Sequence, residues 1–246
     1  MVALCTGAST GIGAECAIAF GARGAHVLVH CNQNRAQADG VAEKVRNAGG
    51  QASVLQADLS NRDGIESLIA QLRESGLSPD ILVNNAGSLI KRTPVLDFTP
   101  ELWHRVFTLN LTSAFFLTQA VLPGMIAKGR GFVVNISSVA ARTGGGIGAL
   151  VYAAAKGALS TATKGLAKEF AGKGIRVNAV SPGTIDTHYH QTFSTPQMLD
   201  SVAQATPAGR LGCPREVADV VVFLCSERAS FVHGQVIEIN GGFLMA

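Results

Sequence analysis

The stretch "VALCTGASTGIGAE", residues 2–15, decides the fold of this chain. A short apolar run leads into a glycine-rich turn, and a segment with helical spacing follows. Glycine lets the backbone turn sharply and lets a ligand approach, while the first turn of a helix offers unpaired N–H groups and a positive dipole end. Gly7, Gly11 and Gly13 have GxxxGxG spacing rather than GxGxxG. Their place after a first strand favours a nucleotide site over an ordinary turn.

Short runs rich in valine and isoleucine recur along the whole chain, at residues 2–5, 26–30, 52–56, 80–84, 132–136, 175–180 and 235–239. Runs this apolar are typical of strands buried on both faces. Segments with helical spacing separate them, at residues 14–23, 33–48, 65–75, 102–128, 151–171 and 215–226. The alternation predicts an α/β fold with a parallel seven-stranded sheet and crossover helices. Residues 184–212 are less regular, and we expect a substrate loop there.

Composition and charge limit the class of protein. The 246 residues suit one domain, 1–246, and a hydrophobic share of 47% with 15% charged residues is typical of a compact enzyme. A net charge of +3 without a Lys/Arg run predicts no nucleic-acid partner. We find no apolar run of membrane-spanning length and no cleavable leader, so we expect no membrane partner and a cytoplasmic location.

Cysteines and histidines give no sign of a metal site. The five cysteines are odd in number and lack a CxxC pair, which predicts neither a disulfide framework nor a zinc site. We interpret Cys213 and Cys225 as small buried hydrophobic residues. His188 and His190 stand in "HYH" without further ligand-type neighbours, so we expect no metal there.

The segment "YAAAK" places Tyr152 four residues before Lys156. On a helix this spacing puts the phenol and the ammonium on one face. A nearby cation favours the phenolate and lowers the pKa of a tyrosine, which is otherwise about 10. The pair therefore either packs or carries out proton transfer.

Polar residues also follow the predicted strands. Asp58 follows the third, "NNAG" at residues 84–87 follows the fourth, and Ser138 follows the fifth, at the strand ends where ligands bind in open α/β sheets. Asn110 stands among apolar neighbours and needs a partner or a water. The alternatives are a capping aspartate, a turn, a helix cap and a satisfied core amide.

The set TGxxxGIG, NNAG, Asn110, Ser138 and YxxxK, in this order, resembles the short-chain dehydrogenase/reductase family over essentially the whole chain. The likeness is greatest to 3-oxoacyl-[acyl-carrier-protein] reductases. It implies a single-domain, Rossmann-like doubly wound sheet and a catalytic tetrad of Asn110, Ser138, Tyr152 and Lys156, with Ser137 as the alternative to Ser138. It also implies a set of cofactor-binding residues: Gly7, Ser9, Gly11, Ile12, Gly13, Asn32, Arg35, Asp58, Leu59, Asn85, Ala86, Gly87, Tyr152, Lys156, Pro182, Gly183, Ile185 and Thr187.

The same resemblance implies the cofactor and the partners. Cys31 stands where family members that use NAD carry an acidic residue, and Asn32, Asn34 and Arg35 follow, so NADP is expected and NAD is the alternative. The expected reaction is hydride transfer between NADP(H) and a carbonyl or alcohol, with 3-oxoacyl thioesters as one substrate class. An NAD-dependent sugar or polyol dehydrogenase is the second hypothesis, and a non-catalytic nucleotide-binding protein is the third. The resemblance also implies a homotetramer and, through Arg130 and Lys173, an acyl carrier protein as partner.

Overall fold

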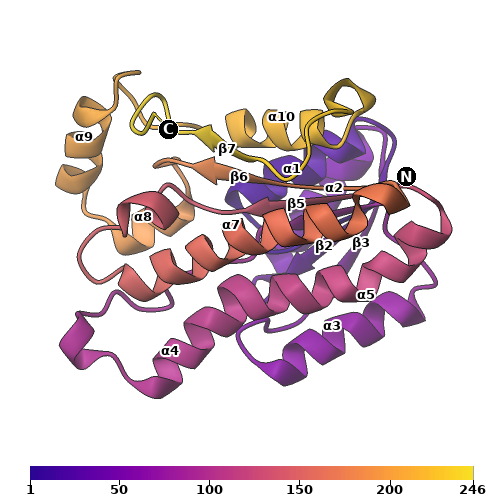
Figure 1. The fold of residues 1–246 in the computed structure, drawn as a ribbon, viewed down its shortest axis with the longest axis horizontal. Coiled ribbons are helices and arrows are strands. Elements are labelled where there is room, and N and C mark those ends of the chain that lie inside the picture. The colour runs from indigo at the N-terminus through magenta and orange to yellow at the C-terminus, as the bar shows by residue number, and fades with distance from the viewer. Residues whose placement is uncertain (246) are drawn as a thin grey trace.

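One parallel sheet organises the chain, and the computed structural model describes it for residues 1–245, apart from the side chains of residues 190 and 191. The strand order is β3-β2-β1-β4-β5-β6-β7. The order reverses between β1 and β4, and the ends of these strands form the crevice where doubly wound sheets bind ligands. The predicted fold class is confirmed (Figure 1). The strands are β1 Val2–Cys5, β2 His26–Cys31, β3 Gln51–Gln56, β4 Ile81–Asn84, β5 Gly131–Ile136, β6 Ile175–Pro182 and β7 Val236–Ile239.

Helices cover both faces of the sheet. One apolar cluster joins the sheet to α1 Gly11–Gly21, α2 Arg35–Asn47 and α10 Pro214–Leu224. A second cluster joins the other face to α3 Arg62–Glu74, α5 Ser113–Ala127 and α7 Leu150–Phe170. The remaining helical segments are 3-10 turns at Val95–Asp97, Ala171–Lys173 and Glu227–Ala229, α4 Pro100–Phe107, a π-helix at Thr108–Thr112, α6 Ala140–Thr143, α8 His188–Phe193 and α9 Pro196–Ala205.

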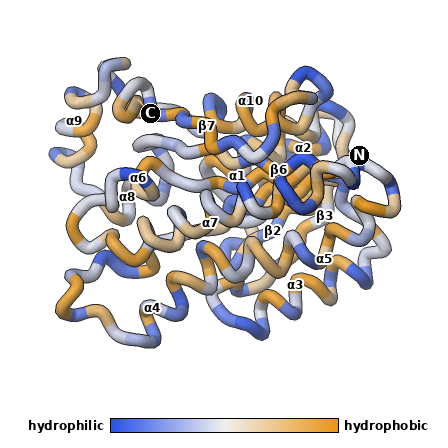
Figure 2. Tube along the Cα trace, in the orientation of Figure 1, coloured by the Kyte–Doolittle hydropathy of each residue, from blue (hydrophilic) through white to orange (hydrophobic). Residues whose placement is uncertain are grey.

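Burial in the strands follows their place in the sheet. In β1, Ala3 and Cys5 belong to one cluster and Leu4 to the other, as expected for a strand covered on both sides. Figure 2 shows the apolar centre that results. The two edge strands depart from the expectation of full burial: β3 exposes Gln51 and Gln56, and every residue of β7 is only partly buried. An edge strand has a neighbour on one side only, so part of it stays open to water.

The stretch from 184 to 212 is more regular than expected. It contains α8 and α9, which lie beyond the carboxyl ends of the strands in Figure 1. Thr195 begins α9 as its N-cap: its side chain accepts a hydrogen bond from the Met198 N–H, and Pro196 takes the first helical position. Both are helix-start signals, and the prediction of an irregular loop overlooked them.

The predicted helix at 102–128 is broken into α4, the π-helix and α5. Together they form a helical stretch Pro100–Ala127 of 28 residues with a mean hydropathy of 1.3 in its most apolar window. By length and composition this stretch could cross a membrane, contrary to the expectation that no apolar run was long enough. One such helix is weak evidence, because core helices pass the same test, and 44% of that window is buried in the fold.

All five cysteines are free thiols. Cys225 is buried as expected, whereas Cys213 is exposed at the N-cap of α10, so its interpretation as a buried residue is wrong. Among the residues that the structure describes, no three histidine, cysteine or acidic side chains gather where they could hold a metal. The side chain of His190 lies outside that part.

Candidate active site

The glycine turn after β1 is held in a conformation that requires glycine. Gly7 and Gly11 have φ angles of 61° and 59°, in the left-handed region where other residues are strained. A Cβ on Gly13 would lie 2.5 Å from Asn85 Nδ2 and from the Gly7 oxygen. Asn85 Nδ2 donates to the Thr6 oxygen at 2.8 Å and to the Gly7 oxygen at 2.9 Å. The end of β4 thus braces the turn that follows β1.

The N-terminus of α1 opens beside this turn. Thr10 is its N-cap, but the threonine side chain makes no capping hydrogen bond, and no acidic residue occupies the first turn. The first N–H groups of a helix have no intrahelical acceptor, and the dipole makes this end positive. The methyl group of Thr187 lies beside this helix start, 3.2 Å from where a Cβ on Gly11 would stand. This cradle fits the pyrophosphate of a dinucleotide.

His30, near the end of β2, is hydrogen-bonded to the glycine turn that forms the cradle. Its Nδ1 accepts a hydrogen bond from the Gly7 N–H at 3.0 Å, and its backbone oxygen accepts one from the Ala8 N–H at 2.7 Å. Because Nδ1 is an acceptor, Nε2 carries the proton and donates to the Ala57 oxygen at 3.1 Å. Burial lowers the pKa of His30 to about 4. The sequence analysis missed this residue, although a histidine ending a buried strand was a signal.

Replacing His30 with leucine should weaken cofactor binding and change the pH dependence of stability. With a folded-state pKa of about 4 against 6.5 when unfolded, the unfolded chain takes up the proton first as pH falls. The wild type therefore loses about 3 kcal/mol between pH 6.5 and 4 through this group. The leucine variant should lack that loss but leave the Gly7 N–H unpaired, at a cost of about 1–3 kcal/mol at pH 7.

Urea unfolding at several pH values and titration with NADPH measure both effects. His26→Asn is the matched control, because His26 lies on the same strand but its ring contacts Ser53 and not the cradle. We expect it to leave NADPH binding unchanged. An equal effect of the two substitutions on NADPH affinity would show that His30 does not position the turn.

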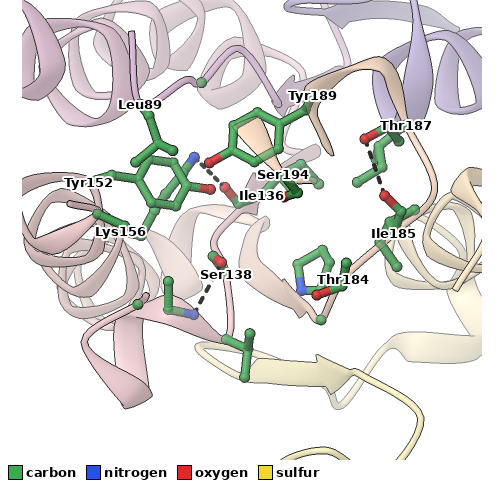
Figure 3. A pocket seen from close by; sticks show the side chains of 18 of the residues that line it. Leu89, Ile136, Ser138, Tyr152, Lys156, Thr184, Ile185, Thr187, Tyr189 and Ser194 are labelled. Carbon is green, nitrogen blue, oxygen red and sulfur yellow. Dashed lines mark hydrogen bonds between the residues drawn. The ribbon is translucent and has the colours of Figure 1, made fainter. Parts of the chain in front are cut away.

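Tyr152 and Lys156 come from the start of α7, and Ser138 from the segment after β5 (Figure 3). The Tyr152 hydroxyl is hydrogen-bonded to Ser138. Lys156 is buried, its Nζ donates to the Ile136 oxygen at 2.7 Å, and it lies 5.7 Å from the centre of the Tyr152 ring. Ser137 turns away instead, since its Oγ contacts Ser160 Oγ at 2.6 Å. Of the two serines, Ser138 therefore faces the tyrosine.

The protonation of this pair differs from the expectation. Burial raises the pKa of Tyr152 to about 12, and the hydrogen bonds to its hydroxyl only reduce that rise. Burial also lowers the pKa of Lys156 to about 7. The expected lowering of the tyrosine pKa by the lysine charge is therefore absent in the protein by itself, because desolvation acts against the charged form of both groups.

Asn110 reaches the same region through the π-helix. Its Nδ2 donates to the Ser88 oxygen at 2.8 Å and to the Val106 oxygen at 2.9 Å, and its Oδ1 accepts from the Ser88 N–H at 3.1 Å. A π-turn widens a helix locally and is frequent at functional sites. A Cβ on Gly87 would lie 2.7 Å from Asn110 Oδ1 and 2.9 Å from Lys156 Nζ. Gly87 is thus the spacer between two predicted catalytic side chains.

A cavity of about 580 Å³ joins the cradle to these side chains. This volume is typical of a site for a small molecule or a cofactor. Seven of the predicted residues do not line the cavity: Asn110, Ser9, Gly13, Asn32, Arg35, Asp58 and Leu59. Of these, Leu59 is buried in the core. The predicted residues that line it are Gly7, Gly11, Ile12, Asn85, Ala86, Gly87, Ser138, Tyr152, Lys156, Pro182, Gly183, Ile185 and Thr187.

Tyr189 on α8 is a pocket residue that the sequence analysis did not assign. Its ring centre lies 6.2 Å from that of Tyr152, and the two hydroxyls point toward each other (Figure 3). The hydrogen bond between them is one of the two that moderate the raised pKa of Tyr152. The one available signal was that Tyr189 is the only other tyrosine of the chain and stands in the expected substrate loop.

Known proteins share this fold and sequence over nearly the full length. A family model described as enoyl-(acyl carrier protein) reductase matches residues 7–244. A 3-oxoacyl-[acyl-carrier-protein] reductase of Synechocystis is 38% identical over 99% of this chain and 97% of its own. A Brucella melitensis 3-oxoacyl-[acyl-carrier protein] reductase with bound NAD is 39% identical, with a TM-score of 0.89 over 100% and 91% of the two chains. A Burkholderia cenocepacia gluconate 5-dehydrogenase, in complex with NADP and tartrate, is 33% identical, with a TM-score of 0.88 over 98% and 94%.

Proposed function

The chain belongs to the short-chain dehydrogenase/reductase family, and on that premise we propose that it transfers a hydride between a nicotinamide dinucleotide and a carbonyl or alcohol carbon. One observation carries the proposal: the Tyr152 hydroxyl, bonded to Ser138 and close to the buried Lys156, opens into the same cavity as the glycine cradle. A pyrophosphate in the cradle and a carbonyl at Tyr152 can therefore be held at the same time.

The residues around the cavity supply the proton chemistry. When bound, the nicotinamide supplies the hydride in reduction and accepts it in oxidation. Tyr152 gives its proton to the carbonyl oxygen in reduction, for which a pKa of about 12 keeps it protonated at neutral pH. Ser138 donates a hydrogen bond to the same oxygen. Lys156, with a pKa of about 7, can return a proton to the tyrosine, and Asn110 holds the adjoining segment in place.

The cofactor preference that we propose is for NADPH, with NADH as the alternative. Cys31 has no exposed surface and lies in the core, so it makes no contact of its own with a ribose phosphate. Arg35 is the nearest exposed cation after β2; its side chain is 51% exposed and is paired with Asp39 at 3.3 Å. That surface ion pair is weak enough for a phosphate to compete with it.

Arg35→Gln should therefore lower kcat/KM for NADPH about tenfold and leave kcat/KM for NADH unchanged, since a tenfold loss corresponds to one charge-assisted contact of about 1.4 kcal/mol. Steady-state kinetics with both cofactors measure it. Arg46→Gln, at the other end of α2, is the control and should change neither value. A wild-type enzyme that favours NADH would contradict the assignment.

The substrate proposal has two forms. Sequence identity to 3-oxoacyl-carrier reductases supports a 3-oxoacyl thioester, and the likeness to a gluconate 5-dehydrogenase supports a sugar acid. A panel of free and carrier-bound thioesters, sugar acids, polyols and simple ketones, followed by nicotinamide absorbance with both cofactors, tests them. If NADPH bound tightly and no compound turned over, the non-catalytic alternative would stand and the enzymatic proposal would fail.

Partners and assembly remain part of the proposal. Arg130 and Lys173 are exposed, but they precede β5 and β6 and so lie at the opposite end of the sheet from the pocket. A carrier protein held by them would have to serve the pocket of a second copy. Phe115, Phe116 and Leu150 expose apolar surface on α5 and α7, which supports the homotetramer and can be checked by light scattering. A cytoplasmic location stays an expectation.

A further inference from the structure

We propose that Arg92 forms an anion subsite in the cavity and that the substrate carries a carboxylate beside its reacting carbonyl. This inference rests on the proposed function and deepens it. Among the described residues that line the cavity, only Arg92 and Lys156 carry a cationic group, and none is acidic. Lys156 is already engaged beside Tyr152, so Arg92 is the charge left for the substrate end.

The guanidinium of Arg92 is held in place by backbone oxygens of two segments that adjoin the cavity. Its Nε donates to the Phe193 oxygen at 3.2 Å, and its Nη1 donates to the Ile147 oxygen at 2.6 Å. Its stem is also tightly packed, because a Cβ on Gly148 would lie 2.8 Å from Arg92 Cγ. A guanidinium fixed in this way loses little conformational entropy when it binds a ligand.

Donors remain for a ligand after these two bonds. A guanidinium has five N–H groups, and Arg92 uses Nε and one N–H of Nη1 in the hydrogen bonds of the described part of the chain. The two N–H groups of Nη2 and the second N–H group of Nη1 remain to donate to a carboxylate. The side chain is partly buried, so an ion pair there would be less screened than on the surface.

The subsite lies next to the reacting groups. The positive charge of Arg92 acts on Tyr189, which in turn contacts Tyr152. Met198, Leu199 and Val202 of α9 also line the cavity, and a carbon skeleton can pack against them. Among the described lining residues the other cation is Lys156, which is engaged beside Tyr152, so the Arg92 site suits one carboxylate better than a phosphate dianion. The geometry therefore points to an oxo or hydroxy carboxylic acid.

Matched pairs of acid and methyl ester test the subsite: 2-oxobutanoate, acetoacetate and levulinate, each against its ester, with saturating NADPH. We expect the wild type to favour at least one acid over its ester by tenfold or more in kcat/KM, mainly through KM. Arg92→Gln should reduce that ratio at least tenfold, and Arg92→Lys, which keeps the charge, should retain part of it. Lys91→Gln removes the neighbouring exposed cation, which does not line the cavity, and should leave the ratio unchanged.

Calorimetric titration of the protein with each acid and each ester, at saturating NADP⁺, measures binding to the subsite without turnover. Binding of an acid that depends on Arg92, with no turnover, would uphold the subsite and refute the proposed reaction. Turnover of esters and acids with equal kcat/KM and equal binding would refute the subsite and leave the reaction standing. Equal losses for acid and ester in Arg92→Gln would also refute the subsite, because Arg92 would then act only by tying α8 to the loop at Ile147.

Discussion

Tyr152→Phe is expected to lower kcat by about 10²–10⁴-fold while NADPH still binds, because general acid catalysis contributes about that factor. The substitution deletes one hydroxyl and keeps the ring. That hydroxyl is bonded to Ser138 and is the proton donor that we propose for the reaction, beside the buried Lys156. Single-turnover kinetics at several pH values, together with a fluorescence titration of NADPH, separate the loss of chemistry from any loss of binding.

Tyr189→Phe is the matched control, since it makes the same chemical change in the only other tyrosine of the chain. Tyr189 contacts the Tyr152 hydroxyl but stands on α8 and not on the helix that carries Lys156, so we expect a loss of kcat of less than tenfold. A Tyr152→Phe enzyme with near-normal kcat would show that Tyr152 only packs. A larger loss of kcat in Tyr189→Phe than in Tyr152→Phe would show that Tyr189, and not Tyr152, transfers the proton.

Gly87→Ala is expected to lower kcat at least about 100-fold, because a displaced catalytic group typically costs that much. The new methyl group would lie 2.7 Å from Asn110 Oδ1 and 2.9 Å from Lys156 Nζ, closer than such atoms approach. Both side chains are buried and hydrogen-bonded, so neither can move without breaking a contact. Overpacking of this kind should also reduce the free energy of unfolding by about 1–3 kcal/mol.

Gly40→Ala is the control for the backbone part of this change. Gly40 lies inside α2, and a Cβ there would meet nothing within 4 Å. Alanine is the better helix former by about 1 kcal/mol, so this variant should be slightly more stable and fully active. Urea unfolding and kcat for both variants are the measurements. Normal activity in Gly87→Ala would mean that Asn110 and Lys156 need not stay where the structure places them.

The sequence by itself determined the features that depend on local pattern. Apolar runs of strand length alternating with helical segments were enough to predict the parallel sheet, and the glycine turn after β1 placed the cradle at its carboxyl edge. The spacing of Tyr152 and Lys156 was enough to place both on one helix face, where the structure has them. These inferences hold because helix and strand periodicity are properties of neighbouring residues.

Only the tertiary structure decided the contacts between distant segments. Gly7 and His30 are 23 residues apart, and Arg92 and Phe193 are 101 apart, so no local pattern could pair them. The exposure of Cys213 likewise depends on what packs over it and not on its neighbours in the chain. The predicted direction of the Tyr152 pKa shift was wrong, and the reason is related. The charge of Lys156, four residues away, is visible in the sequence, whereas the loss of water around the Tyr152 hydroxyl is a property of the folded pocket. In this protein the loss of water has the larger effect on the pKa of Tyr152.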